Sequence, residues 1–236
     1  MILSHTHNFA ILVPWKTASS TLHARFEALN ESPYSRFYYF SPYLNRVVHQ
    51  HITCAEFSAF PESRLGYATA AFVRNPYDRV FSGFIQMQRD LRDQGQAAFP
   101  SPWIREIVLR QLDENRAALA RADCDFDRWV AGLSEADVYV VGRNTSLPLH
   151  PVHYWTHMAG EKCVSFIGRV ETFEADLAAF CTRAGIADPE RLNRNVSDGG
   201  DGDGEYRYAA AMRPATRDKI ERLFVEDFAL FRYRTF

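Results

Sequence analysis

The sequence predicts an α/β protein in which helices flank a parallel sheet of about four or five strands. Two segments carry this prediction, because each is a nearly continuous apolar run that ends in a polar turn and is followed by helical spacing. These runs are residues 9–13 and 67–73, and their composition is typical of strands that are covered on both faces. Strands that alternate with helices indicate parallel pairing, with ligands bound at the carboxyl ends of the strands.

Each further element follows from a local pattern. After the first strand, Leu22, Phe26 and Leu29 recur at helical spacing, and the hydroxyl residues before them are suited to cap the start of a helix. Thr53 and Glu56 are spaced as a capping box, which predicts that a short helix begins there. We also expect short strands at 36–40, 47–52 and 163–167, helices at 55–60, 76–92, 103–122, 126–133, 172–184 and 214–224, a loop-rich segment at 139–155, flexible segments at 93–102 and 197–205, and a docked aromatic tail at 227–233.

Length and composition limit the class of protein. A chain of 236 residues, of which 47% are apolar, suits one globular domain over 1–236. The net charge of −2 gives no global basic field, so nucleic acid and anionic membranes are not expected as partners. No run is long and apolar enough for an integral membrane segment, and the four scattered cysteines favour reduced thiols. With no signal peptide pattern, we expect a cytoplasmic protein.

The segment after the first strand has the composition of a phosphate-binding loop. Pro14 ends the strand, Lys16 follows it, and hydroxyl residues up to Thr21 lead into the helix. The first N–H groups of a helix lack internal partners, and the helix dipole favours an anion beside them. The nucleoside-triphosphatase pattern G-x-x-x-x-G-K-[ST] is absent. The alternative interpretation is an ordinary capped helix after a strand.

A second phosphate motif follows the strand at 67–73. Arg74 stands at the end of that strand, and Ser82 lies on the second turn of the helix that begins at Pro76. A guanidinium fork together with a hydroxyl suits a terminal phosphate. Taken by itself, Arg74 would also fit a surface ion pair.

The two motifs, in this order, resemble those of a known family. The run from Pro14 to Thr21 is similar to the 5′-phosphosulfate loop of sulfotransferases, and residues 74–82 resemble their 3′-phosphate motif, R-[DN]-P-[YFW]-[DE]-R-[LV]-x-S. The group that the chain resembles is that of the carbohydrate sulfotransferases, which includes the 2-O-sulfotransferases. Further segments that are similar to this group lie at 166–177, 193–197 and 220–233.

The resemblance implies a fold, a donor and a set of site residues. The fold would be a P-loop NTPase-like three-layer sandwich, and the donor would be 3′-phosphoadenosine 5′-phosphosulfate (PAPS), which leaves as adenosine 3′,5′-bisphosphate (PAP) with no metal required. Lys16 would touch the bridging oxygen and neutralise the departing phosphate, and Arg74 with Ser82 would hold the 3′-phosphate. Arg169 and Phe173 would approach the nucleotide base. The residues that would cradle the 5′-phosphosulfate are Thr17, Ala18, Ser19, Ser20 and Thr21.

Transfer to a hydroxyl also needs a general base, and histidine fits this role near neutral pH. His49 and His51 lie between the two motifs, and alternation along a strand would place both imidazoles on one face. The 2-O-sulfotransferases carry a similar His-x-His, so we expect His51 to be the base and His49 to assist it or to bind the acceptor. A structural pair or a metal site are the alternatives. Trp15 departs from the family pattern, in which proline directly precedes lysine, and would be a register bulge or a base-stacking residue.

These features predict a sulfotransferase that moves a sulfuryl group in line to an acceptor hydroxyl. We expect a carbohydrate or glycoconjugate acceptor, and the nearly neutral chain favours a small glycan, a lipid-linked sugar or a secondary metabolite over a long sulfated polymer. Residues 93–160, which match the family loosely, would be a helical and loop elaboration that lines the acceptor site. The acidic glycine-rich segment 198–205 would close over the site when nucleotide binds. Candidate acceptor-binding residues are His49, His150, His153, Tyr154 and Trp155, although the last four also fit a surface loop.

Two other functions are compatible with this fold. A nucleotide-dependent kinase is disfavoured, because the Walker glycines and a strand-end acidic partner for Mg²⁺ are missing. A domain that binds a nucleotide or glycan without catalysis would be expected to lose Lys16 or the histidine base, and both are present.

Overall fold

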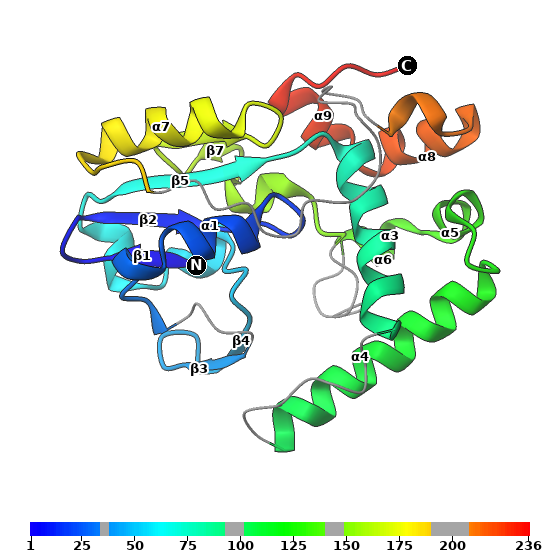
Figure 1. The fold of residues 1–236 in the computed structure, drawn as a ribbon, viewed down its shortest axis with the longest axis horizontal. Helices are drawn as coiled ribbons and strands as arrows, with labels where there is room; N and C mark the ends of the chain where they lie inside the picture. Colours follow the sequence, from blue (N-terminus) through cyan, green and yellow to red (C-terminus); the bar gives the residue numbers. More distant parts are fainter. Residues whose placement is uncertain (34–37, 93–101, 140–148, 190–207) are drawn as a thin grey trace. The chain divides into compact units, whose positions relative to one another are not determined.

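The computed structural model of the chain contains two compact units, which are described separately (Figure 1). The first unit is formed by Met1–Arg74 and Val152–Asp201, and the second by Asn75–Pro151 and Gly202–Phe236. The prediction of a single domain stays a prediction. The structure describes residues 1–33, 38–92, 102–139, 149–189 and 208–236.

A four-stranded sheet forms the centre of the first unit. Its strands are β1 (Ile2–Ser4), β2 (Phe9–Leu12), β5 (Ala68–Val73) and β8 (Phe166–Arg169), in the order β1-β2-β5-β8. The pairs β2–β5 and β5–β8 are parallel, which confirms the predicted parallel centre of the sheet. The edge strand β1 is antiparallel to β2, so the sheet is mixed. This strand was not predicted, because three residues are too few for a visible period.

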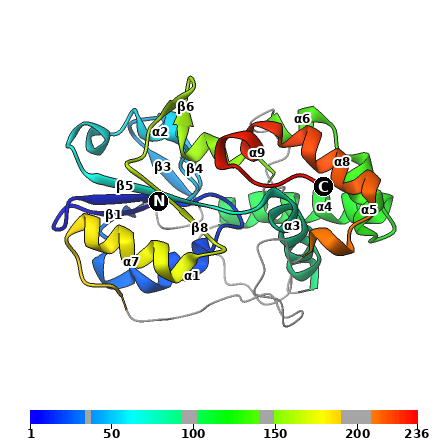
Figure 2. The same ribbon diagram turned by 90° about the horizontal axis from the view of Figure 1, so that it is seen from above.

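Helices and loops cover both faces of this sheet. Side chains of β2 alternate between two core clusters: Phe9 and Ile11 pack on one face, and Ala10 and Leu12 on the other. Figure 2 shows α1 (Ser19–Arg25) and α7 (Phe173–Ala184) on the first of these faces, and α2 (Cys54–Phe57) on the opposite one. The α/β class is therefore confirmed, with α7 close to its predicted range.

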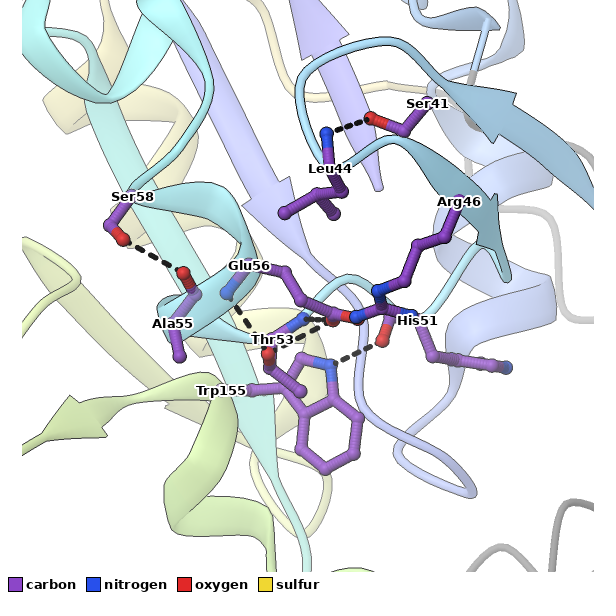
Figure 3. Close-up of polar contacts among 9 residues, drawn as sticks. All are labelled: Ser41, Leu44, Arg46, His51, Thr53, Ala55, Glu56, Ser58 and Trp155. Carbon is purple, nitrogen blue, oxygen red and sulfur yellow. Dashed lines mark hydrogen bonds and ion pairs between the residues drawn. The ribbon is translucent and has the colours of Figure 1, made fainter. Parts of the chain in front are cut away.

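Short strands and a capped helix complete the first unit. A hairpin is formed by β3 (Tyr39–Ser41) and β4 (Arg46–Val48), and a second by β6 (His157–Met158) and β7 (Glu161–Lys162). The strand predicted at 47–52 thus ends at Val48, and the strand predicted at 163–167 lies three residues later, in β8. The capping box of Thr53 and Glu56 is present, as predicted (Figure 3). Of the strand predicted at 36–40, residues 36 and 37 lie outside the described ranges.

The described part of the second unit is helical. The helices are α3 (Pro76–Arg92), α4 (Pro102–Arg121), α5 (Phe126–Gly132), α6 (Glu135–Tyr139), α8 (Pro214–Leu223) and α9 (Val225–Phe231). The predictions for α3, α4, α5 and α8 are confirmed within a residue or two, whereas α6 was missed. The aromatic tail does dock on the core, since Phe228 and Phe231 are buried, but it does so as the helix α9.

Three predicted segments cannot be compared, or can be compared only in part, with the structure. Residues 93–101 and most of 140–155, together with the acidic glycine-rich segment 198–205, lie outside the described ranges in whole or in part. In the ranges that are described, no helix combines the length and the apolarity that a membrane span requires.

Candidate active site

The loop between β2 and α1 has a tightly turned backbone. Lys16 and Ala18 both adopt left-handed conformations, with φ of 60° and 62°. The buried Thr17 hydroxyl donates a hydrogen bond to the carbonyl oxygen of Pro14, at 3.1 Å, which closes the turn. Ala18 is the N-cap of α1 and no side chain caps this helix, so the prediction that a hydroxyl residue caps it is wrong. The turn itself aligns the first helical N–H groups, and the hydroxyl residues are not consumed as caps.

Lys16 of the first phosphate motif and Arg74 of the second meet within the first unit. Parallel pairing of β2 with β5, with Leu12 opposite Ala71, brings the carboxyl ends of both strands to the same edge of the sheet. The Arg74 guanidinium consequently reaches the Lys16 backbone, where Nη1 lies 3.5 Å from the carbonyl oxygen. Ser82 lies on α3 in the second unit and is buried.

The two candidate histidines lie side by side beyond the end of β4. Their rings stack with centroids 4.8 Å apart and an angle of 8° between the planes. We predicted that alternation along a strand would produce this arrangement. It does not, because β4 ends at Val48, before both histidines. Instead, two contacts hold His51: its Nδ1 lies 2.5 Å from the Val13 carbonyl oxygen, and its own carbonyl oxygen accepts a hydrogen bond of 3.2 Å from Trp155 Nε1 (Figure 3).

Burial keeps both imidazoles neutral. Desolvation lowers the pKa of His49 to about 3, and that of His51 well below its usual value. Because a carbonyl oxygen can only accept, His51 Nδ1 must carry the proton, and Nε2 is then the unprotonated nitrogen. The Gln50 side-chain nitrogen lies 3.4 Å from this Nε2. A neutral imidazole with its lone pair on Nε2 is the state that a general base requires.

Trp15 has a role in this cluster that the sequence did not indicate. Its indole stacks on His51 with centroids 3.9 Å apart, and on His49 at 4.7 Å. The residue is half-buried and packs at the margin of the core cluster that also contains Trp155. The loop residue that departs from the family pattern is thus an aromatic neighbour of the histidine pair.

The segment after β8 is organised by a carboxylate. Asp176 accepts hydrogen bonds of 2.7 Å from the Arg169 backbone N–H and from the hydroxyl of Thr172. Phe173 is half-buried, and the centroid of its ring lies 5.2 Å from that of the buried Phe72 ring. The Arg25 guanidinium carbon lies over this ring, 5.3 Å from its centroid. Phe173 is therefore anchored at the edge of the sheet that Arg169 also occupies.

Arg25 itself was missed by the sequence analysis. It forms a two-pronged ion pair with Glu174, with N–O distances of 2.9 and 2.5 Å, and its side chain is fully buried. A basic residue in the last turn of an amphipathic helix gives no signal of such a partner 149 positions away.

The proposed acceptor residues fall into both units. In the second unit, His150 Nδ1 lies 2.8 Å from the Val138 carbonyl oxygen. In the first unit, His153, Tyr154 and Trp155 belong to a short 3₁₀ helix, Val152–Trp155. His153 is 8% exposed and Trp155 only 1% exposed. The geometry therefore favours Trp155 as a support for His51 over a direct contact with an acceptor.

In the described residues, no group of three or more His, Cys, Asp or Glu side chains is arranged to hold a metal ion.

Comparison with known proteins identifies the family to which the chain belongs. No match to the chain was found among curated proteins or solved structures. A family model described as the sulfotransferase family matches residues 1–234, nearly the whole length. The chain therefore belongs to the sulfotransferase family and is a sulfotransferase.

Proposed function

We propose that this enzyme transfers the sulfuryl group of PAPS to a hydroxyl of a carbohydrate or glycoconjugate acceptor, with His51 as general base. The observation that carries the proposal is that one short segment, residues 13–16, contacts both candidate histidines and Arg74. Val13 holds His51, Trp15 packs on both histidines, and Lys16 meets Arg74 through its carbonyl oxygen.

The chemistry of this edge of the sheet fits a donor with phosphate groups. Two cationic residues, Lys16 and Arg74, stand at the ends of adjacent strands, beside a helix start whose N–H groups lack internal partners. We assign the 5′-phosphosulfate to residues 17–21 and the 3′-phosphate to Arg74, and the role of Ser82 stays the prediction made from the sequence. Arg169 and Phe173, which end β8 and begin α7, are assigned to the side of the base.

In the proposed mechanism, one residue takes the proton of the acceptor hydroxyl and another neutralises the charge on the departing phosphate. His51 Nε2 takes the proton of the acceptor hydroxyl as its oxygen bonds to sulfur, and Lys16 neutralises the negative charge that develops on the departing phosphate oxygen. His49, stacked on His51, orients the acceptor. Positioning and charge stabilisation supply most of the catalysis in such in-line transfers, and a side-chain base contributes about 10²–10⁴-fold. No metal is needed in this scheme, since the cationic side chains carry the electrostatic role.

We further propose a small glycan, a lipid-linked sugar or a secondary metabolite as acceptor. The support is the net charge of −2, which does not favour a long sulfated polymer. Residues 93–160 are the candidate acceptor-lining segment, with His150, His153 and Tyr154 as the side chains to test first.

A calorimetric titration with PAP, without Mg²⁺, tests the donor. We expect micromolar binding, which corresponds to about −8 kcal/mol, and at least a tenfold loss in Arg74→Ala. Arg183→Ala, which removes an exposed arginine from α7, is the matched control and should bind normally. Tighter binding of ATP with Mg²⁺ would instead favour a kinase.

Turnover of PAPS in the presence of glycan acceptors tests the base. His51→Gln should lower kcat by about 10²-fold or more while the affinity for PAP stays within about twofold of wild type. Normal PAP binding with no sulfuryl transfer to any glycan in the wild-type enzyme would contradict the proposed acceptor class.

A further inference from the structure

Trp15 lies where the donor loop and the histidine pair meet. Along the chain it directly precedes Lys16, and in space its indole faces His51 at 3.9 Å with an interplanar angle of 29°. The same indole faces His49 at 4.7 Å and 23°. With the two imidazoles 4.8 Å apart, the three rings form one compact stack. Residues from two separate segments, the β2–α1 loop and the β4–α2 connection, are joined in it.

The stack restricts how the His51 ring can turn. A histidine ring rotates about its Cβ–Cγ bond in a broad, roughly two-fold well, so sterics within the side chain do not fix which nitrogen faces the site. The hydrogen bond from Nδ1 to the Val13 carbonyl oxygen selects one orientation. The indole face lies against the imidazole plane and blocks tilting away from it.

The main chain of His51 is held independently. Trp155, buried on the opposite sheet face from α1 and α7, donates its indole N–H to the His51 carbonyl oxygen at 3.2 Å. One tryptophan thus secures the backbone and the other contacts the ring. A substitution of Trp15 therefore leaves the Trp155 hydrogen bond to the His51 backbone in place, so we expect it to change the orientation of the His51 ring without unfolding the protein.

We propose that Trp15 is a positioning residue that holds the His51 imidazole with Nε2 directed to the acceptor hydroxyl and links this orientation to the Lys16 loop. The inference rests on the proposed role of His51 as base. A purely structural filler would be expected in the core, yet Trp15 is half-buried and sits beside Lys16. Misplacement of a reacting group by about 1 Å can cost about 10²-fold in rate, which is the size of effect at stake.

Within the described residues, no anionic group is found to act on the His51 ring. The groups whose charge acts on it are His49, His23 and the amino group of Met1, all of which disfavour its protonated form. The contacts that orient the ring are the Val13 carbonyl oxygen, the aromatic stack and the Gln50 side-chain nitrogen, which lies 3.4 Å from Nε2.

The test compares Trp15→Leu with Trp15→Phe, which keeps an aromatic face. Phe166→Leu is the matched control, because it also removes a half-buried aromatic ring from the first unit. Phe166 lies in β8 and packs with Phe180, in the core cluster on the other face of the sheet from Trp15. Long-range ¹H–¹⁵N correlation spectra report the His51 tautomer without any need for turnover. Steady-state kinetics and a pH profile of kcat follow on the same proteins.

In the wild-type enzyme we expect a single Nδ1–H tautomer of His51. Trp15→Leu should show a mixture of tautomers and a kcat lowered about 10–100-fold, with an unchanged Kd for PAP. Trp15→Phe should recover kcat to within about fivefold of wild type. Phe166→Leu should lose stability to urea but keep both the tautomer and kcat.

Two outcomes separate the inference from the proposed function. If His51→Gln keeps full turnover, the proposed base is wrong. If His51→Gln loses turnover while Trp15→Leu keeps both the tautomer and kcat, the inference about Trp15 is overturned and the indole is only a packing residue.

Discussion

Mild acid should destabilise the first unit, because folding there keeps histidines neutral. Burial lowers the pKa of His49 from 6.5 to about 3 and that of His23 from 6.5 to about 4. In the unfolded chain both rings titrate at their ordinary value. Below pH 6.5 the unfolded state therefore binds protons that the folded state excludes, and the free energy of unfolding falls. The full stability is present above this pH and is lost down to about pH 3 to 4.

The decrease in the free energy of unfolding can be calculated from the difference between the pH and the pKa of the unfolded state. A pH of about 5 lies roughly 1.5 pH units below the unfolded pKa of each ring. At 1.36 kcal/mol per pH unit, each ring then lowers the free energy of unfolding by about 2 kcal/mol. Burial shifts the pKa of His51 in the same direction, so it adds to the loss. A combined change of about 4 kcal/mol is a large part of the 5–15 kcal/mol that stabilises a typical domain.

Urea unfolding at pH values between about 7.5 and 5 measures this change. Glu31 acts outside this pH range: hydrogen bonds from Thr6 and Ser4 lower its pKa to about 2, so its stabilising effect is lost only below its ordinary value of 4.5. His49→Asn should reduce the drop in unfolding free energy by about 2 kcal/mol, because the ring that resists protonation is gone.

The matched control is His7→Asn, which removes an exposed imidazole from the turn between β1 and β2. Equal slopes in His49→Asn and wild type would refute the reasoning. Such a result would mean that the His49 ring is reached by water and protonates in the folded protein.

Two further predictions concern the packing of each unit. In the second unit, Asp227→Asn leaves the fully buried Arg79, 3.8 Å away, without its counter-charge, and should cost about 3–5 kcal/mol in urea unfolding; a loss below about 1 kcal/mol would show that solvent reaches the pair. In the first unit, a Cβ at Gly168 would lie 2.5 Å from the buried Phe72 ring, so Gly168→Ala should cost about 1–3 kcal/mol. Gly132→Ala, with open space around it in α5, is the control and should be neutral or stabilising, and equal effects at the two glycines would contradict the packing argument.

The sequence predicted the elements that carry strong periodicity or a clear start signal. The apolar runs became β2 and β5, and Pro76 begins α3 where expected. Elements that depend on tertiary pairing were missed or shifted. The edge strand β1 is visible only through its partner β2, and β8 is set by its register with β5 rather than by the apolar run that precedes it.

The candidate site was predictable as a set of motifs but not as a geometry. Strand ends in a parallel sheet brought Lys16 and Arg74 together, as the motif order implied. The prediction of a side-by-side histidine pair was correct for a wrong reason, since β4 ends at Val48 and the two rings stack on each other and on Trp15 beyond it. Aromatic stacking and the Arg25 ion pair connect residues that no local pattern relates.

The cost of the histidine pair is itself an argument for function. A buried imidazole that resists protonation lowers stability in mild acid, and apolar residues could fill the same space without that penalty. His51 also places its one donor on a backbone carbonyl, which leaves Nε2 unprotonated, with the Gln50 side-chain nitrogen 3.4 Å away. The catalytic role that we propose for His51 would account for a fold that keeps such an unfavourable group in a defined tautomer, stacked on the tryptophan that precedes Lys16.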